Sequence, residues 1–267
     1  MSQRTLTQLE SLHDRVITCT ACERLRAYCR DVGVTRRAAY REWDYWTRPV
    51  PGFGDPRARL WIIGLAPGAH GANRTGRIFT GDRSGDFLYA ALHRAGFANQ
   101  PTSTSRDDGL KLSDCYISAA ARCAPPDNKP SPTEIEACAR FLDEEWRMLA
   151  RKRVILALGR IAWDAALRLA RRAVSPSPGT PGEGRGEGSS ASARGARMSK
   201  DPHPDALPSE WNKAKRLRAF AHGAVVPLAR DRVLIGSYHV SQQNTFTGRL
   251  TPRMFDDVLA RCRDHFI

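Results

Sequence analysis

Four short runs of apolar residues stand out along the chain, at positions 60–64, 115–120, 154–158 and 233–236. Each run leads towards a turn or a helix signal. Continuous apolar runs of this length are typical of strands that are buried on both faces, as in parallel sheets. The pattern therefore predicts a central, mainly parallel, four-stranded sheet.

Helix signals alternate with these runs. Residues 84 to about 95 place their apolar side chains on one face. The sequence SPTE, which starts at Ser131, is a capping box with proline at the first helical position, and its helix is predicted to run through Trp146. Further helices are predicted over 160–172 and from Pro252 onwards. The alternation predicts a three-layer α/β/α sandwich, a fold class in which ligands bind at the carboxyl ends of the strands.

Composition favours a single domain, residues 1–267, with a basic surface. Lys and Arg number 42 against 28 Asp and Glu, which gives a formal net charge of +14. Such an excess favours a polyanionic partner, with nucleic acid ahead of a membrane surface. Residues 175 to about 210 are rich in Gly, Pro and Ser, and we expect a disordered insertion there. That segment holds four basic and five acidic residues, so the positive charge belongs to the rest of the chain.

The expected location is the cytoplasm, without a membrane partner. No apolar run approaches the roughly 20 residues that span a bilayer, and the N-terminus lacks the charged-then-apolar order of a secretion signal. In a reducing compartment, clustered cysteines hold metal more often than they form disulfides.

The seven cysteines include a pattern that suits a four-thiolate site. Cys19 and Cys22 form a closely spaced pair, and Cys123 and Cys138 follow far along the chain. Such a set holds either zinc or a 4Fe–4S cluster, and spacing does not choose between them. The alternative is that Cys123 and Cys138 are ordinary buried thiols. The other three cysteines, which show no partner pattern and are expected to be structural, are Cys29, Cys115 and Cys262.

Two polar loops follow the first and the last predicted strand. The first loop, residues 64–82, contains five glycines and ends at Asp82, just before a helix start. A carboxylate at that position can cap the helix or act in catalysis, and the pattern alone leaves both open. The second loop places His239 among amide side chains. Since both loops follow strands of one sheet, we expect the carboxylate and the imidazole to converge on one site.

Three segments of the chain resemble the family 5 uracil-DNA glycosylases. They are GLAPGAHGANRTGRIFTGD at 64–82, ARCAPPDNKPSPTEIEAC at 121–138 and SYHVSQQNTFTGRLT at 237–251. The sequence PVPGFGDP before the first strand is also similar to that family. The resemblance runs from Cys19 to the last predicted helix, except for the insertion.

This resemblance implies a uracil-DNA glycosylase-like fold and a hydrolase of base excision repair whose partner is DNA containing uracil or other deaminated bases. It also implies a structural 4Fe–4S cluster bound by Cys19, Cys22, Cys123 and Cys138. Zinc is the alternative occupant. Metal would tie the N-terminal segment to the segment after the second strand, so losing it would cost folding free energy.

The resemblance implies a role for four further side chains. Asp82 matches a catalytic carboxylate that positions the attacking water and stabilises positive charge on the deoxyribose. His239 matches a histidine that hydrogen-bonds a base carbonyl and stabilises the departing base. Asn128 matches a polar residue that acts in catalysis or base contact. Phe79 matches an aromatic residue that stacks on the flipped base, which is worth about 1–3 kcal/mol in single-strand systems.

The same segments are expected to supply the rest of the substrate contacts. Flipping a base leaves a gap in the duplex, and amide side chains of the second loop are expected to enter it. These are Gln242, Gln243 and Asn244, while the expected pocket lining is Gly64, Ala66, Pro67, Gly68 and Ala119.

The base range is expected to be broad. Ala119 stands where the related family 4 enzymes carry an asparagine that reads uracil, and Ala69 and His70 stand where they carry acidic residues. A pocket without a fixed amide discriminates less sharply between bases, so we expect activity on hypoxanthine as well. We expect a monomer, associated with the nucleoid through DNA, that hydrolyses the bond without a lyase step. The non-enzymatic alternative is a metal-stapled protein that binds DNA without releasing a base.

Overall fold

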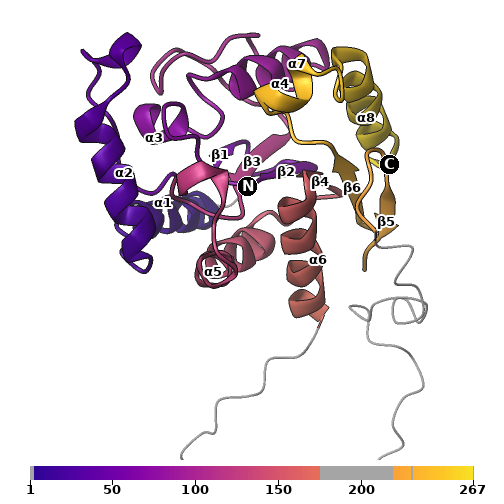
Figure 1. Cartoon of the computed structure of the whole chain (residues 1–267). Coiled ribbons are helices and arrows are strands. Elements are labelled where there is room, and N and C mark those ends of the chain that lie inside the picture. The colour runs from indigo at the N-terminus through magenta and orange to yellow at the C-terminus, as the bar shows by residue number, and fades with distance from the viewer. Residues whose placement is uncertain (1–2, 175–218, 230, 267) are drawn as a thin grey trace, which may run out of the picture.

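The computed structural model describes residues 3–174, 219–229 and 231–266 (Figure 1). The predicted insertion at 175–210 lies outside these residues. The elements in chain order are α1 (Gln3–Ile17), α2 (Glu23–Thr35), the 3-10 turn η1 (Ala38–Tyr40), β1 (Phe53–Gly54), β2 (Leu60–Gly64), α3 (Ala72–Thr75), α4 (Arg83–Arg94), β3 (Cys115–Ala119), the 3-10 turn η2 (Pro126–Asn128), α5 (Pro132–Met148), β4 (Val154–Leu158), α6 (Arg160–Val174), β5 (Val225–Pro227), β6 (Val233–Ser237), α7 (Gln242–Phe246) and α8 (Pro252–Asp264).

The sheet has six strands in the order β1-β3-β2-β4-β6-β5. Its four inner strands are parallel to one another and are the four that the apolar runs predict. The outer strands β1 and β5 pair antiparallel with β3 and β6, and the sequence analysis did not predict them. Both are very short and contain glycine or proline, which are depleted in strands, so they carry little strand signal.

Each inner strand sends alternate side chains into two separate cores. On β2, Leu60 and Ile62 belong to the core under α4 and α8, whereas Trp61 and Ile63 belong to the core under α1, α5 and α6. Figure 1 shows α4, α7 and α8 on one side of the sheet and α5 and α6 on the other. Because both faces of β2 are covered, the strand is apolar without interruption. The predicted three-layer α/β/α class is thereby confirmed.

The predicted helices correspond to α4, α5, α6 and α8. At the start of α5, the Ser131 hydroxyl accepts a hydrogen bond from the Glu134 backbone N–H at 3.2 Å, and the Glu134 carboxylate accepts one from the Ser131 N–H at 2.7 Å. This capping box is the one that the sequence predicts. The same carboxylate pairs with Arg24 of α2 at 2.7 Å, which ties α2 to the start of α5.

Helices α1 and α2 were not predicted. The signal in α1 is present, because Leu9, Leu12 and Val16 recur at helical spacing and are buried against the sheet. None of the described helices combines the length and apolarity that crossing a membrane requires.

Candidate functional site

The two polar loops lie at the same edge of the sheet. The first leaves β2 after Gly64 and the second leaves β6 after Ser237, with β4 between the two strands. All three strands are parallel and in register, so their carboxyl ends share one edge. The expected placement of both loops beside each other follows from this pairing.

Asp82 caps helix α4 with one carboxylate oxygen and directs the other into the first loop. Its Oδ1 accepts a hydrogen bond from the Gly85 backbone N–H at 3.0 Å. A Cβ added at Gly68 would lie 2.7 Å from Oδ2, and one at Gly71 would lie 1.9 Å from it. Glycine is therefore needed at both positions for the carboxylate to approach the loop backbone. The capping role that the sequence left open is present, and it still leaves one oxygen available to a ligand.

The environment of Asp82 is poor in water. Burial raises the pKa of its carboxyl group above the ordinary value. Hydrogen bonds from the backbone N–H groups of Gly85 and Ser84 oppose this rise, and so does the positive charge of Arg74. A carboxylate held in this way is poorly solvated and keeps a strong interaction with any positive charge that develops next to it.

Phe79 connects the first loop to the second. Its backbone has φ of 52°, a conformation that is strained for an aromatic residue. Its ring lies over the end of β2, where a Cβ at Gly64 would come within 2.8 Å of Cζ. The ring centroid is 6.3 Å from that of His239, with the planes tilted by 38°. The Phe79 ring therefore contacts His239 from the loop that carries Asp82.

His239 is held as a neutral imidazole. Burial lowers its pKa to about 4, so it carries no charge at neutral pH. The Asn244 amide donates a hydrogen bond to the His239 backbone carbonyl at 2.8 Å, which fixes the loop after β6. Among the described residues no hydrogen bond joins Asp82 to His239, so the two groups do not satisfy each other.

A cation inserted between aromatic rings braces the first loop. The Arg74 guanidinium carbon lies 3.8 Å from the Tyr40 ring centroid and 4.1 Å from that of Trp43. Arg74 also donates to the backbone carbonyls of His70 and Gly81 at 2.8 and 2.7 Å. Sequence reasoning missed this brace, because Tyr40 and Trp43 lie in a segment without strong secondary-structure signal.

The other residues predicted to contact the substrate differ in their exposure to solvent. Gly64 and Ala119 are buried at the ends of β2 and β3, and Ala66, Pro67 and Gly68 follow in the first loop. Gln242 and Gln243 are exposed on α7, whereas Asn244 is half-buried and engaged with His239. Asn128 is exposed in η2, and no hydrogen bond or ring contact among the described residues joins its side chain to Asp82 or His239.

Phe246 is a surface feature that the sequence analysis did not single out. Its side chain is 69% exposed at the end of α7, beside Gln242 and Gln243. Single exposed apolar side chains are common on protein surfaces, so it is the place of Phe246 on α7 that makes it a candidate for ligand contact.

The four cysteines of the predicted metal site line one pocket, although they come from three distant parts of the chain. Cys19 and Cys22 precede α2, Cys123 follows β3, and Cys138 lies in α5. The pKa of Cys22 is raised to about 11, first by burial and then by the proximity of Cys138 and Cys123. Four thiols this close cannot all ionise unless a cation is bound between them.

Zinc and a 4Fe–4S cluster place different demands on the four sulfur atoms. A tetrahedral zinc site needs four sulfurs within about 2.3 Å of one ion. In the described part of the chain, no group of three His, Cys, Asp or Glu side chains is placed to hold one metal ion. A 4Fe–4S cube spreads its thiolates further apart, since each binds a different iron atom. Arg122 also lines this pocket, and its buried Nε and Nη1 have no hydrogen-bond partner among the described residues.

Cys29 also belongs to this region, although its spacing suggested no partner. It is buried, its thiol lies beside that of Cys123, and its Sγ donates to the Ala124 carbonyl at 3.6 Å. The ligand set proposed from the sequence contained four cysteines, and the structure adds a fifth thiol against one of them.

The similarity of the chain to known proteins identifies its family. The model of the uracil DNA glycosylase superfamily matches residues 51–263. A type-5 uracil-DNA glycosylase of Thermus thermophilus is 45% identical over 254 residues, which is 95% of this chain and 96% of the relative. One of Mycobacterium bovis is 44% identical over 253 residues, covering 94% of this chain and 80% of the relative. A type-4 enzyme of Pyrobaculum aerophilum is 30% identical over 165 residues, 61% of this chain and 67% of the relative.

The chain belongs to the type-5 uracil-DNA glycosylases. This membership confirms the family and the fold that the three sequence segments predict. It also confirms the predicted enzyme class, a uracil-DNA glycosylase. The roles of individual residues and the occupant of the cysteine pocket stay predictions.

The buried histidine makes a testable contribution to stability. The pKa of His239 falls from 6.5 to about 4 on folding, so between these values the unfolded chain binds more protons. We expect the free energy of unfolding to decrease as the pH falls from 6.5 towards 4. Denaturant titrations of His239→Gln at pH 7.5 and 5 should show a smaller decrease than the wild type.

Two features of the design isolate this effect. His13, whose pKa is also lowered to about 4, remains in the variant and retains part of the decrease. Exposed His93 on α4 provides the matched control, and His93→Gln should keep the full decrease. An unchanged pH dependence in His239→Gln would contradict the buried, neutral assignment.

Proposed function

We propose that this protein hydrolyses the N-glycosidic bond of uracil in DNA and leaves an abasic site. The observation that carries the proposal is the Asp82 carboxylate, whose Oδ1 caps α4 while Oδ2 faces a loop that only glycine at 68 and 71 allows it to approach. The family of the chain and its net charge of +14 support DNA as the partner.

Asp82 acts on the sugar. Cleavage of an N-glycosidic bond passes through an oxocarbenium-like state with positive charge on the deoxyribose. A fixed anion in a poorly hydrated place stabilises that state more than the ground state. Oδ2 also accepts a hydrogen bond from the attacking water and positions it. The cap keeps the carboxylate from rotating, so little reorganisation is needed during the reaction.

His239 acts on the leaving base. As a neutral imidazole it donates its N–H to a carbonyl oxygen of the base, where negative charge accumulates as the bond breaks. A charged imidazolium is disfavoured by burial, which lowers its pKa to about 4. The hydrogen bond from Asn244 to the His239 carbonyl makes Asn244 a positioning residue for this group.

The base reaches these groups by flipping out of the duplex. Unstacking and unpairing cost a few kcal/mol, least for mismatched or damaged bases, and this is a first source of selectivity. Phe79 supplies the ring on which the flipped base stacks. Gln242, Gln243 and the exposed Phe246 of α7 enter the vacated position. Phe246 is the apolar member of the three, and apolar side chains insert as wedges between base steps in other DNA-binding proteins.

Hydrolysis uses water and stops at the abasic site. The described lysines are Lys111, Lys129 and Lys152. Lys129 is exposed beside Asn128 in the turn after η2, and Lys152 is buried with its ammonium on backbone carbonyls below α5. None of these three lysines lies in the loops that carry Asp82 and His239, so neither loop contributes an amine for a Schiff base.

The four-cysteine pocket holds a 4Fe–4S cluster. A bound cluster links the N-terminal segment to β3 and α5 through Cys19, Cys22, Cys123 and Cys138. The convergence of these four thiols supports a cationic occupant held by thiolates, and the two unpartnered N–H groups of Arg122 suit the sulfur atoms of the resulting anionic assembly. Its contribution is structural, because ligation of distant segments stabilises the folded state.

Replacing Asp82 by asparagine tests the proposal. Asparagine also caps helices, so the fold and the DNA affinity should persist. The rate of uracil release should fall by roughly two to three orders of magnitude, as when a single charge-stabilising group is removed from an active site. The assay is single-turnover release from a uracil-containing duplex, followed by alkali to cleave abasic sites.

Asp86→Asn is the matched control, because Asp86 is an exposed carboxylate in the first turn of the same helix. It should release uracil at nearly the wild-type rate. Comparable rates in Asp82→Asn and Asp86→Asn would exclude the catalytic assignment. DNA binding without any release in the wild type would favour the non-enzymatic alternative.

The base range tests the pocket. Ala119 is 1% exposed at the end of β3 and offers no amide to read a base. We therefore expect release of hypoxanthine as well as uracil from paired oligonucleotides under excess enzyme. Strict dependence on uracil, with inosine untouched, would show that other groups impose the discrimination.

Iron analysis tests the cluster. Protein purified without oxygen should contain about four iron atoms and four sulfides per chain. Cys138→Ser should lose most of this iron and unfold more readily, whereas Cys262→Ser, on the buried face of α8, should keep it. Zinc in place of iron, or an unchanged iron content in Cys138→Ser, would contradict the assignment.

A further inference from the structure

A fully buried ion pair lies next to the cysteine pocket. The Arg122 Nη2 and the Glu145 Oε2 are 2.6 Å apart, and both side chains are 1% exposed. Burying two charges is costly, and such a pair is retained only where its remaining hydrogen-bonding groups are also satisfied. The other N–H groups of the Arg122 guanidinium therefore need hydrogen-bond partners as well.

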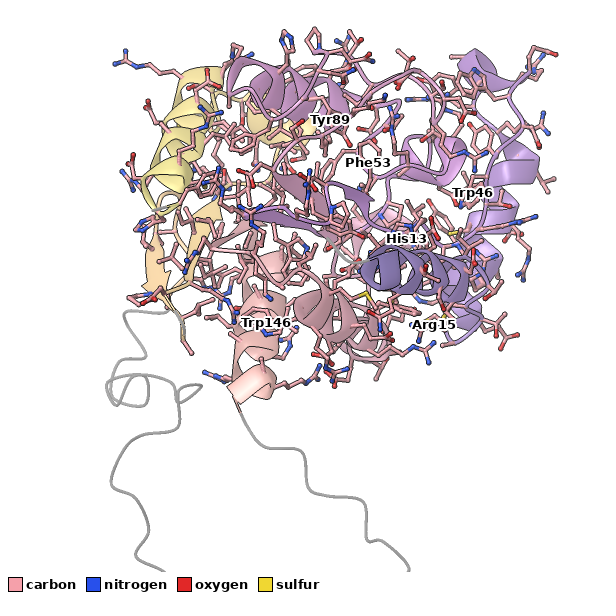
Figure 2. The ribbon with its side chains drawn as sticks, turned by 180° about the vertical axis from the view of Figure 1, so that it is seen from behind. His13, Arg15, Trp46, Phe53, Tyr89 and Trp146 are labelled. Atoms are coloured by element: carbon pink, nitrogen blue, oxygen red, sulfur yellow. The ribbon has the colours of Figure 1, made fainter. Side chains whose placement is uncertain are left out.

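The acid of this pair is well satisfied. The Tyr116 hydroxyl donates to the second oxygen, Glu145 Oε1, at 3.4 Å. The Tyr116 oxygen is in turn 3.1 Å from Nε2 of His13, on the helix α1 that lies beside the sheet (Figure 2). Since a carboxylate can only accept, the hydroxyl proton belongs to the Tyr116–Glu145 bond and His13 donates to Tyr116. Glu145 is thus anchored from two sides.

Arg122, the basic partner of the pair, has hydrogen-bonding groups that are not satisfied. The guanidinium has five N–H donors, and its Nε and Nη1 are buried without a partner. Arg122 lines the pocket together with all four cysteines that would hold the cluster. It directly precedes Cys123 in sequence, and its backbone hydrogen-bonds the thiol of Cys138. The charge of the guanidinium also interacts with the Cys138 thiol, which places the side chain of Arg122 next to the cluster site.

We propose that Arg122 is a hydrogen-bond donor to the cluster, with Nε and Nη1 directed at its sulfide or cysteine sulfur atoms and Nη2 fixed by Glu145. This inference rests on the cluster proposed above. Hydrogen bonds to the sulfurs and nearby positive charge make the reduced, more negative cluster easier to form, so they raise its reduction potential. Arg122 is thus a positioning and tuning residue, and it takes no part in the chemistry on the sugar.

Arginine suits this position better than lysine. Its planar fork can donate to the carboxylate through one edge and to the cluster through another, and it stays charged when buried. An ammonium group at the same place is a single point of charge. If it remains paired with Glu145, it has no second rigid edge to offer.

The test is a mediated spectroelectrochemical titration of the iron-loaded protein. Arg122→Lys keeps the charge and loses the fork, and we expect its midpoint potential to be more negative than that of the wild type. A tenfold change in the one-electron equilibrium corresponds to about 59 mV, and we expect a shift of at least this size. Arg77→Lys is the control, because Arg77 is a buried arginine paired with Asp108 that does not line the cysteine pocket.

A second comparison covers the case in which Arg122→Lys does not fold. Arg122→Met combined with Glu145→Gln removes both charges at similar volume, a change that buried ion pairs often tolerate. Measured against Glu145→Gln alone, the double variant should again shift to more negative potential. Variants that bind iron with the wild-type midpoint potential would overturn the proposal.

The outcomes separate this inference from the proposals beneath it. Wild-type protein that takes up no iron and sulfide under reconstitution would remove the cluster, and the role of Arg122 with it. Uracil release that depends on Asp82 would survive that result, because the assay does not measure the cluster. If the wild type binds the cluster and the Arg122 variants have the wild-type midpoint potential, only the role of Arg122 is contradicted.

Discussion

The position of one carboxylate constrains the whole candidate site. Asp82 is fixed by the N-terminus of α4 through Oδ1, and this leaves Oδ2 in contact with the glycines of the loop after β2. Helix N-termini attract anions, so the interaction that stabilises the helix also holds the charge at the position that the proposed mechanism uses. The loop must then be glycine-rich and must be braced from outside, which Arg74 does between two aromatic rings.

The two candidate sites of the molecule share a short piece of chain. Strand β3 ends at Ala119, which lines the expected base pocket, and Arg122 and Cys123 follow at the cysteine pocket. A segment that serves both places has little freedom to move. Ligation of Cys123 would therefore also stabilise the end of β3 beside the expected base pocket. A structural cluster could support that pocket in this way without any contact with the substrate.

Sequence reasoning succeeded where the signal is local or strongly periodic. The four inner strands, the capping box at Ser131 and the helices α4, α5, α6 and α8 all carry such signals. It failed for β1 and β5, whose pairing is decided by neighbours and not by their own residues. It also gave Cys29 no partner, because the contact with Cys123 joins residues that no spacing rule connects.

By itself, the sequence determined the order of the four inner strands and of helices α4, α5, α6 and α8, the two loops that carry Asp82 and His239, and the cysteine pattern that suits a four-thiolate site. These follow from residue type and spacing, which fix local conformation and donor chemistry. Only the tertiary structure decided that Asp82 divides its oxygens between helix and loop, that His239 is buried and neutral, and that Arg122 buries two unpartnered N–H groups in a residue that lines the cysteine pocket. Burial and the absence of a partner depend on what distant segments place nearby, and a linear pattern does not contain that information.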